Sequence, residues 1–250
     1  MNSLFLKLSL LCMGISISVL AQEVSTPVGS NNNQQNSLGS FDHEAVYGLT
    51  SVRGENDSDS MHGGYELLHE YGNFKNLFDS DLYYTAENHD ATTHIFMVEA
   101  KSRYYLKKDD YVYAGIYYED DRFSGYSWEN YYSAGYGHVF HISQDMTVLA
   151  EAGIGQRRTR LRRGNRDRDF IGIAHTEFNW QLDDGVQIRQ KITALTGSDG
   201  TDTKSDTSIK AQVYENIALK LTHFIKHQTD APVGISHTKT ITSINLVYNF

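Results

Sequence analysis

The amino-acid sequence predicts an all-β fold, an antiparallel up-and-down transmembrane β-barrel of about twelve strands. Its composition, a recurring strand-length pattern and two alternating classes of connection support this prediction. The 250 residues include 17 Tyr, 11 Phe and 20 Gly but only 2 Pro. The mean hydropathy is negative although 40% of the residues are hydrophobic. Strands that alternate polar and apolar residues produce this combination.

The first segment, residues 1–21, has the features of a cleavable signal peptide. Lys7 supplies a positive end, "LSLLCMGISISVL" supplies an apolar core, and Val19 and Ala21 precede the expected cleavage site. The apolar run is too short for a membrane-spanning helix of about 20 residues. The residues before Cys12 are not the small residues expected of a lipoprotein. We therefore expect an exported protein whose mature chain has no cysteine and no disulfide.

The rest of the chain divides into a tether and one large domain. Residues 22–40 are polar and of low complexity, which predicts a disordered tether. Residues 41–250 repeat strand-like runs separated by breaks, without helical periodicity, and are expected to form an outer-membrane β-barrel. Strands are predicted near residues 43–53, 60–71, 75–86, 91–106, 110–119, 128–141, 145–160, 168–181, 186–196, 204–213, 217–227 and 238–250.

The connections between the predicted strands alternate between two classes. Short turns rich in Gly, Asn and Asp, such as "GNFK" and "LDDG", alternate with mostly longer polar loops, such as "GENDSDS" and "QTDAPVGIS". Outer-membrane barrels have short turns on the periplasmic side and longer loops outside. Both ends of the barrel chain are therefore expected on the periplasmic side.

Within the predicted strands, hydrophobic residues alternate with polar ones. In "IALKLTHFIK", Leu219 and Leu221 share one face, whereas Lys220 and Lys226 share the other. A soluble β-sandwich or a lipocalin-like barrel would also alternate, but the export signal and the scarcity of Pro favour a membrane barrel. Aromatic residues near strand ends are candidates for interfacial girdles. They are Tyr104, Tyr118, Tyr136, Phe140, Phe178, Trp180 and Tyr248.

The last predicted strand, "ITSINLVYNF", alternates hydrophobic residues and ends on Phe250. This ending resembles the C-terminal assembly signal of bacterial outer-membrane proteins. The resemblance implies that barrel-assembly machinery recognises this strand and that the protein is located in the cell outer membrane.

Four segments of the chain carry a family resemblance: "YYEDDRFSGYSW", "EAGIGQR", "TGSDGTDTKSDTSIKAQV" and "LKLTHFIKHQTDAPVGISHTKTITSINLVYNF". In this order, over residues 43–250, they closely resemble the salt-induced outer membrane protein family of Gram-negative bacteria, which is defined by a domain of unknown function. The resemblance implies an outer-membrane β-barrel associated with salt or osmotic stress. It implies no reaction, ligand or catalytic residue. The basic run between Arg157 and Arg168 is denser than the family pattern.

Three consecutive acids, Glu119, Asp120 and Asp121, precede Arg122 where the fifth strand is expected to enter an outer loop. Clustered carboxylates can hold Ca²⁺, which takes about 6–8 oxygen ligands. We favour a structural rim in which Arg122 pairs with one of the acids and Gly125 allows a tight turn. A divalent-ion site is the alternative hypothesis.

The run "RRTRLRRGNRDRD" gathers arginines at the connection between the seventh and eighth strands, on the predicted external side. Guanidinium groups bind phosphate in a bidentate manner, and lipopolysaccharide presents phosphates at this level. Alternation places Arg158, Arg160 and Arg162 on the outer face, whereas Arg157 and Arg163 are expected to point inward or over the barrel mouth. The predicted lipopolysaccharide- or anion-binding residues are Arg158, Arg160, Arg162 and Arg163. A solvated loop with internal pairs to Asp167 and Asp169 is the alternative.

Inward positions of the predicted strands carry charges of both signs. The predicted lumen charges are Asp79, Asp81, Glu99, Lys101, Arg103, Glu151, Glu177, Arg189, Lys191 and Lys220. In a wide lumen these charges would create a transverse field along a solute path. In a narrow barrel they would pair with each other and close the bore. A barrel of twelve strands is intermediate in size between small barrels filled by side chains and porins of about 16–18 strands. Barrel size therefore allows either a pore or a plugged barrel.

The sequence does not predict an enzyme. It has no HExxH, no Ser-centred motif and no Cys/His spacing of a metal site. His175 and Glu177 share a face, but a lone inward His is more often a hydrogen-bonded lumen residue than a base. The formal net charge of −9 argues against nucleic acid as a partner. No cofactor or metal is predicted.

The predicted role is a passive channel for ions or small solutes, linked to osmotic or salt stress. The alternative is a non-conducting structural or lipopolysaccharide-binding barrel that maintains the envelope. An outer-membrane hydrolase is the third hypothesis.

Overall fold

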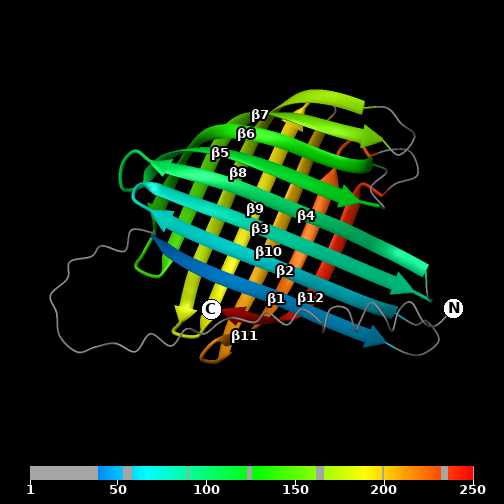
Figure 1. The fold of residues 1–250 in the computed structure, drawn as a ribbon, viewed down its shortest axis with the longest axis horizontal. Helices are drawn as coiled ribbons and strands as arrows, with labels where there is room; N and C mark the ends of the chain where they lie inside the picture. Colours follow the sequence, from blue (N-terminus) through cyan, green and yellow to red (C-terminus); the bar gives the residue numbers. More distant parts are fainter. Residues whose placement is uncertain are drawn as a thin grey trace. The chain divides into compact units, whose positions relative to one another are not determined.

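The computed structural model in Figure 1 describes residues 39–52, 58–88, 90–122, 126–161, 166–198, 200–231 and 236–249. These residues form β-strands and no helix. No membrane-crossing helix is found in that described part of the chain. The predicted signal peptide (residues 1–21), the predicted tether up to residue 38, and Phe250 lie outside the described residues.

Twelve antiparallel strands form a closed barrel. They are β1 (Ser40–Val52), β2 (Ser58–Tyr71), β3 (Phe74–Glu87), β4 (Asp90–Tyr105), β5 (Asp110–Asp121), β6 (Tyr126–His141), β7 (Met146–Leu161), β8 (Arg166–Asp183), β9 (Val186–Gly197), β10 (Gly200–Tyr214), β11 (Ile217–Gln228) and β12 (Thr238–Asn249). Each strand pairs with its sequence neighbours, and β1 pairs with β12 to close the sheet. The predicted all-β barrel and its twelve strands are confirmed.

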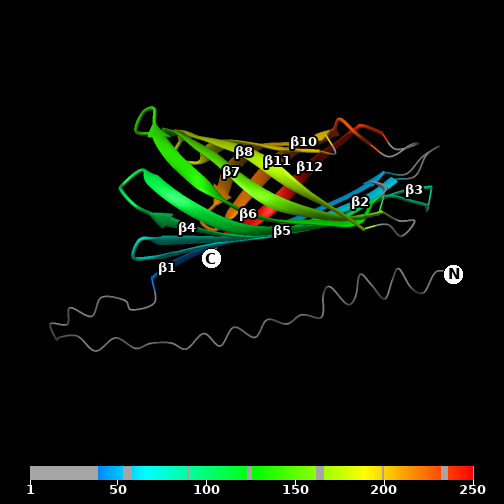
Figure 2. The ribbon, with the colours of Figure 1, turned by 90° about the horizontal axis from the view of Figure 1, so that it is seen from above.

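The strands are tilted around the barrel, as closure of a sheet requires. In Figure 1 the strands β1 to β6 run across the front, while the strands of the rear wall cross behind them at a steep angle. Figure 2 shows the same two walls from above as opposing curved layers. Strands that lie far apart in the sequence therefore face each other across the interior.

The connections at the predicted external end are shorter than the sequence suggested. Strands β3 and β4 pair out to Glu87 and Asp90, so their connection is residues 88–89. Strand β10 begins at Gly200, opposite Gly197 of β9, whereas the sequence predicted a start near residue 204. The ladders extend because each further pair satisfies backbone N–H and C=O groups. The longest connection at this end is residues 229–237, between β11 and β12.

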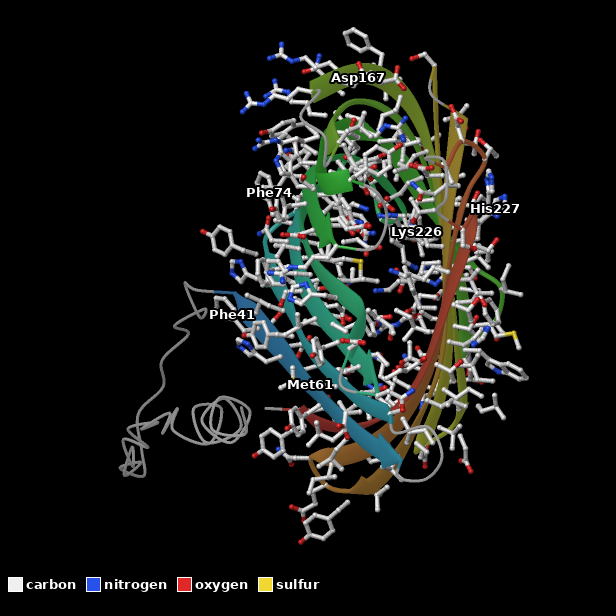
Figure 3. The ribbon with its side chains drawn as sticks, turned by 90° about the vertical axis from the view of Figure 1, so that its right-hand side faces the viewer. Phe41, Met61, Phe74, Asp167, Lys226 and His227 are labelled. Atoms are coloured by element: carbon white, nitrogen blue, oxygen red, sulfur yellow. The ribbon has the colours of Figure 1, made fainter. Side chains whose placement is uncertain are left out.

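The outer surface of the barrel is apolar. Leu219 and Leu221 of β11 are exposed, whereas Thr222 and Lys226 on the opposite face of the same strand are buried, so the predicted alternation is confirmed. The predicted girdle residues that are exposed are Tyr104, Tyr118, Tyr136, Phe140 and Tyr248; Phe178 and Trp180 are partly buried. Figure 3 shows Phe41 and Phe74 projecting away from the barrel, and Lys226 directed toward its interior. An apolar exterior and a polar interior are the arrangement of a transmembrane β-barrel.

Glycines on the inner face make room for tyrosine rings. A Cβ atom at Gly137 of β6 would overlap the ring of Tyr111, and one at Gly153 of β7 would overlap the hydroxyl of Tyr113. Both tyrosines come from β5 and are almost fully buried. The rings therefore lie against the neighbouring wall and fill part of the interior.

The outward apolar face gives a direct test of the membrane assignment. Ile244 lies midway along β12 and is 67% exposed. Replacing Ile244 with Arg should lower the free energy of unfolding in lipid vesicles by about 2–4 kcal/mol, because a charge would face hydrocarbon. Urea titration monitored by tryptophan fluorescence measures this change. The control Asp184→Arg, in the exposed turn between β8 and β9, should change stability by less than about 1 kcal/mol. Equal effects of the two substitutions would contradict the assignment.

Candidate functional site

The interior of the barrel is the candidate functional site, because charged side chains from most strands meet there. The ten predicted lumen charges all lie on the inner face, where each lines a cavity or pairs with a residue that does. Most of them are joined in ion pairs. The question is whether these pairs leave an open bore.

One group of side chains spans the barrel, and we call it the closing layer: Tyr117, Glu119, Lys204 and Lys226. Glu119 of β5 is 2% exposed and accepts hydrogen bonds from Lys204 Nζ at 2.8 Å and from Tyr117 Oη at 2.6 Å. Its other oxygen pairs with Lys226 of β11. Lys204 Nζ also lies 3.9 Å from the centre of the Tyr117 ring. Both carboxylate oxygens are therefore occupied by cations from the far side of the barrel.

The contacts of the closing layer show how narrow the lumen is at this height. In the closed order of twelve strands, β11 is the strand directly opposite β5. A side-chain pair between Glu119 and Lys226 can form only if their two side chains together span the lumen. At this level side chains from opposite strands therefore cross the bore.

Other pairs reach across the barrel at different heights. Asp121 of β5 binds Lys239 of β12 at 2.9 Å. Nearer the other end, Lys191 of β9 lies 3.5 Å from Asp79 of β3, which is again the opposite strand. In the same region Arg189 binds Glu66 of β2 at 3.1 Å. The closure is thus supported by pairs at several heights, which follow the tilt of the strands.

A small apolar cluster lies beside the closing layer. It consists of Tyr117, Tyr131, Ile171, Ile173 and Leu195, with Met97 packed against it. The rings of Tyr117 and Tyr131 stack with their centres 4.8 Å apart. These side chains come from β4, β5, β6, β8 and β9, so they form a packed core inside the barrel.

Glu151 organises the charges of one wall. Its carboxylate forms ion pairs with Lys101 Nζ at 2.9 Å and with Arg103 Nη2 at 2.8 Å, and it accepts a hydrogen bond from the Tyr111 hydroxyl at 3.0 Å. The side chain of Glu151 is 1% exposed. A buried charge is tolerated when it is paired and hydrogen-bonded, and this carboxylate meets both conditions.

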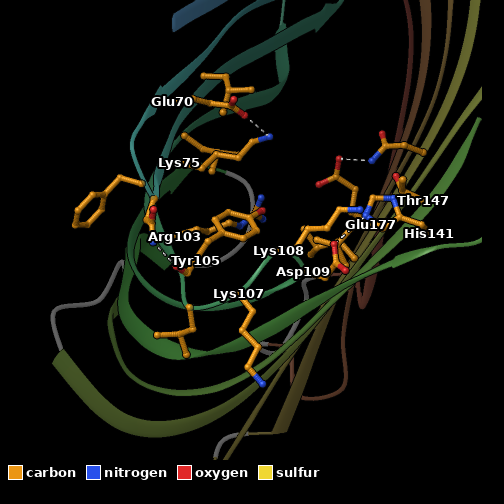
Figure 4. Close-up of a pocket in the computed structure, with 18 of the residues that line it drawn as sticks. Glu70, Lys75, Arg103, Tyr105, Lys107, Lys108, Asp109, His141, Thr147 and Glu177 are labelled. Atoms are coloured by element: carbon orange, nitrogen blue, oxygen red, sulfur yellow. Dashed lines mark hydrogen bonds and ion pairs between the residues drawn. The ribbon is translucent and has the colours of Figure 1, made fainter. Parts of the chain in front are cut away.

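A wide vestibule opens at the short-turn end of the barrel. Its volume is about 850 Å³, and its lining includes Glu70, Lys75, Arg103 and Glu177. Figure 4 shows these side chains around an open space, together with Lys107 and Lys108 of the turn between β4 and β5. Further inside, the described cavities shrink to about 120 Å³ and about 50 Å³. The interior is therefore a funnel that narrows to the closing layer.

The three consecutive acids do not form one cluster. Strand β5 extends to Asp121, so the three residues alternate between faces. Glu119 and Asp121 are buried inside and bind lysines. Asp120 lies on the outer face. Instead of the predicted pairing with the adjacent Arg122, these carboxylates pair with lysines of β10, β11 and β12, because the strand continues where a loop was expected. Among the described residues, no group of three or more His, Cys, Asp and Glu is arranged to hold a metal ion.

The arginine run is divided as alternation predicts. Arg157 is buried inside, with its guanidinium 2.8 Å from Asp202 and 3.3 Å from Asp169. Arg158 and Arg160 lie on the outer face of β7. The other two predicted anion-binding residues, Arg162 and Arg163, lie outside the described residues.

The inward histidine considered in the sequence analysis, His175, is hydrogen-bonded within the wall. His175 Nδ1 lies 2.8 Å from Thr193 Oγ1 of the neighbouring strand. Glu177, on the same face, accepts a hydrogen bond from Asn179 at 3.0 Å and lies 3.7 Å from Arg189. This arrangement is that of structural lumen residues.

Sequence reasoning placed single charges correctly but missed their partners. Lys204, Lys226 and Glu66 were not among the predicted site residues, yet they complete the pairs that cross the lumen. The alternation of β11, which placed Lys226 beside Lys220 on the inner face, was the available signal. Which opposite charge each lysine meets depends on the width and stagger of the barrel, which local sequence does not encode.

Comparison with known proteins places the chain in a family. Residues 45–250 match the family described as "Protein of unknown function, DUF481", and the chain belongs to that family. A curated relative is the uncharacterized protein YdiY of Escherichia coli strain K12, which is 24% identical over 166 residues. That match covers 66% of this chain and 66% of the relative.

Solved structures of other proteins match most of this chain at low sequence identity. The COG4313 outer membrane channel from Pseudomonas putida F1 matches with 13% identity and a TM-score of 0.49, over 89% of this chain and 99% of that chain. The translocator domain of the autotransporter NalP from Neisseria meningitidis matches with 9% identity and a TM-score of 0.48, over 87% and 90%. At this distance neither structure assigns a role to any residue of this barrel.

The closing layer should contribute strongly to stability. Glu119→Ala would remove the acid that forms ion pairs with both buried lysines, Lys204 and Lys226, and the free energy of unfolding should fall by about 3–5 kcal/mol. Urea unfolding in lipid vesicles measures this loss. The matched control is Glu70→Ala, because Glu70 pairs with Lys75 at 2.7 Å but its side chain is 47% exposed. That control should cost less than about 1 kcal/mol. Similar losses for the two variants would contradict the structural role of the closing layer.

Proposed function

We propose that this protein is an outer-membrane barrel with a closed lumen, which serves the envelope as a non-conducting structural element. The observation that carries this proposal is the contact between Glu119 and Lys226, which joins opposite strands of the barrel. The role predicted first from the sequence, a passive channel, requires a continuous aqueous path at this height. The side chains of the closing layer cross the lumen at that height, which supports the proposal.

Electrostatics supports the closed state. Separating Glu119 from its two lysines would expose three charges in a narrow, poorly hydrated bore. Each unpaired buried charge costs several kcal/mol. The nearby Tyr117–Tyr131 stack would also have to move before an ion could pass. The closed arrangement is therefore favoured unless water enters together with the solute.

The outer membrane is the proposed location. The apolar exterior fits a bilayer, and the predicted export signal and C-terminal strand fit delivery through the periplasm. A closed barrel adds no ion leak to the membrane, which suits the predicted association with salt or osmotic stress. Insertion by barrel-assembly machinery through β12 is part of this proposal.

A gated channel is the second candidate, and the vestibule favours it. A cavity of about 850 Å³ lined by charged residues would be a suitable entrance for small solutes. In that case the closing layer would be the gate. The two candidates differ in whether the native protein ever conducts.

Planar-bilayer recording separates the two candidates. We expect the refolded mature protein to show no steady conductance, because the closing layer blocks the bore. The triple variant Glu119→Ala, Lys204→Ala, Lys226→Ala removes three opposed side chains without leaving an unpaired charge among them, and it should conduct. Folding of both proteins is checked by heat-modifiable migration in gels. Frequent openings of the wild-type protein would overturn the closed-barrel proposal and favour the gated channel.

A further inference from the structure

The outer face of β7 and β8 carries four arginines in two directly opposed pairs. In the register of the two strands, Arg158 pairs with Arg168 and Arg160 pairs with Arg166. The members of a directly opposed pair have Cβ atoms about 4.5–5.5 Å apart. Arg160, Arg166 and Arg168 are exposed, and Arg158 is partly buried. We call these four residues the arginine quartet.

The acids of the same region do not neutralise the quartet. Asp169 points inside and is bound to Arg157. Asp167 belongs to the same inward-facing set of β8, opposite Thr159, and its Oδ1 accepts the backbone N–H of Arg168 at 2.7 Å. Among the described residues, none of the four guanidinium groups forms an ion pair. Directly opposed like charges destabilise a sheet, so a bound external anion would stabilise the quartet.

Apolar side chains lie on the outer face between the quartet and the middle of the membrane. The Arg158 guanidinium lies 5.7 Å from the centre of the Tyr132 ring. Its Nε is enclosed and has no hydrogen-bond partner among the described residues. The next outer-face residue of β8 after Arg168 is Phe170, which is 79% exposed. On β7, Gln156 follows Arg158 and accepts a hydrogen bond from it at 3.3 Å, and Ile154, the outer-face residue after that, is 76% exposed. The cations therefore border directly on the lipid-facing surface.

An apolar groove begins beside the quartet. It has a volume of about 710 Å³ on the outer face, and its lining includes Phe41, Phe78, Ala100, Ile116 and Tyr132. Tyr132 thus connects the groove to Arg158. A ligand that fills both features must have an anionic head and a long apolar part.

The position of Arg158 along β7 places the quartet at the height of the outer lipid headgroups. Arg158 is the thirteenth residue of β7, counted from Met146 at the short-turn end. Twelve steps of roughly 3.3 Å along a strand tilted by about 45° rise roughly 28 Å. The apolar band of such barrels is about 25 Å tall, so the quartet lies at the level of the outer headgroups. Nitrogen-rich side chains project from the barrel beside Asp167 in Figure 3.

We propose that the arginine quartet binds the phosphate groups of a phosphorylated glycolipid of the outer leaflet, whose acyl chains lie on Ile154, Phe170 and the groove beside Tyr132. Guanidinium groups bind phosphate through two parallel hydrogen bonds, and two opposed pairs can hold two phosphates. This site is independent of whether the lumen conducts.

Binding of a defined lipid tests the proposal. The probes are a purified bis-phosphorylated lipid A, the same lipid after removal of its phosphates, and inorganic pyrophosphate. The full mature protein is refolded in a neutral detergent, and affinity is measured by calorimetry. We expect the phosphorylated lipid to bind at least about tenfold more tightly than the dephosphorylated lipid. Equal affinities would overturn the proposal. Pyrophosphate binding as tightly as the lipid would show a site for soluble anions and would overturn the lipid assignment.

Variants locate the site. The double variant Arg158→Gln, Arg168→Gln should weaken binding of the phosphorylated lipid by about tenfold or more. Arg158→Lys with Arg168→Lys keeps the charge but loses the bidentate geometry, so an intermediate loss is expected. The control Lys107→Gln, Lys108→Gln removes the same charge at the other end of the barrel and should have less than about a twofold effect. Equal losses in the quartet and control variants would indicate non-specific attraction and overturn the site.

Discussion

A charge on the inner face of a narrow barrel is stabilised when a counter-charge on another strand reaches it. Glu119 meets this requirement with Lys204 and Lys226, and Glu151 meets it with Lys101 and Arg103. An unpaired charge in a bore with little water would cost several kcal/mol. The same pairs that make these charges tolerable also hold the walls of the barrel together. Closure of the lumen is therefore a consequence of how the inner charges are stabilised.

The outer face follows a different rule. The arginine quartet has no acidic partner among the described residues on its own face, although the chain as a whole carries a net charge of −9. Inside, Arg157 is neutralised by Asp169 and Asp202. One stretch of β7 thus supplies a paired arginine to the lumen and unpaired arginines to the exterior. This difference is the basis of the proposal that the outer arginines bind anionic lipid.

The fold and the direction of individual side chains could be predicted because strand periodicity is local. Alternation placed Arg157 inside and Arg158 outside, and it placed Lys101 and Glu151 in the lumen. The pairing of Glu119 with β10 and β11 could not be predicted in this way. It depends on which strands face each other and at what height, and those are properties of the closed barrel. The expected pairing with Arg122 was wrong for the same reason, because a local neighbour was chosen where a distant one is available.

Side-specific labelling of the vestibule tests the closed lumen most directly. The predicted mature chain has no cysteine, so Asn179→Cys introduces a single thiol into the lining of the vestibule. In vesicles with one barrel orientation, a charged thiol reagent should label this residue from the short-turn side and not from the opposite side. Labelling at equal rates from both sides would show a continuous aqueous path and contradict the account.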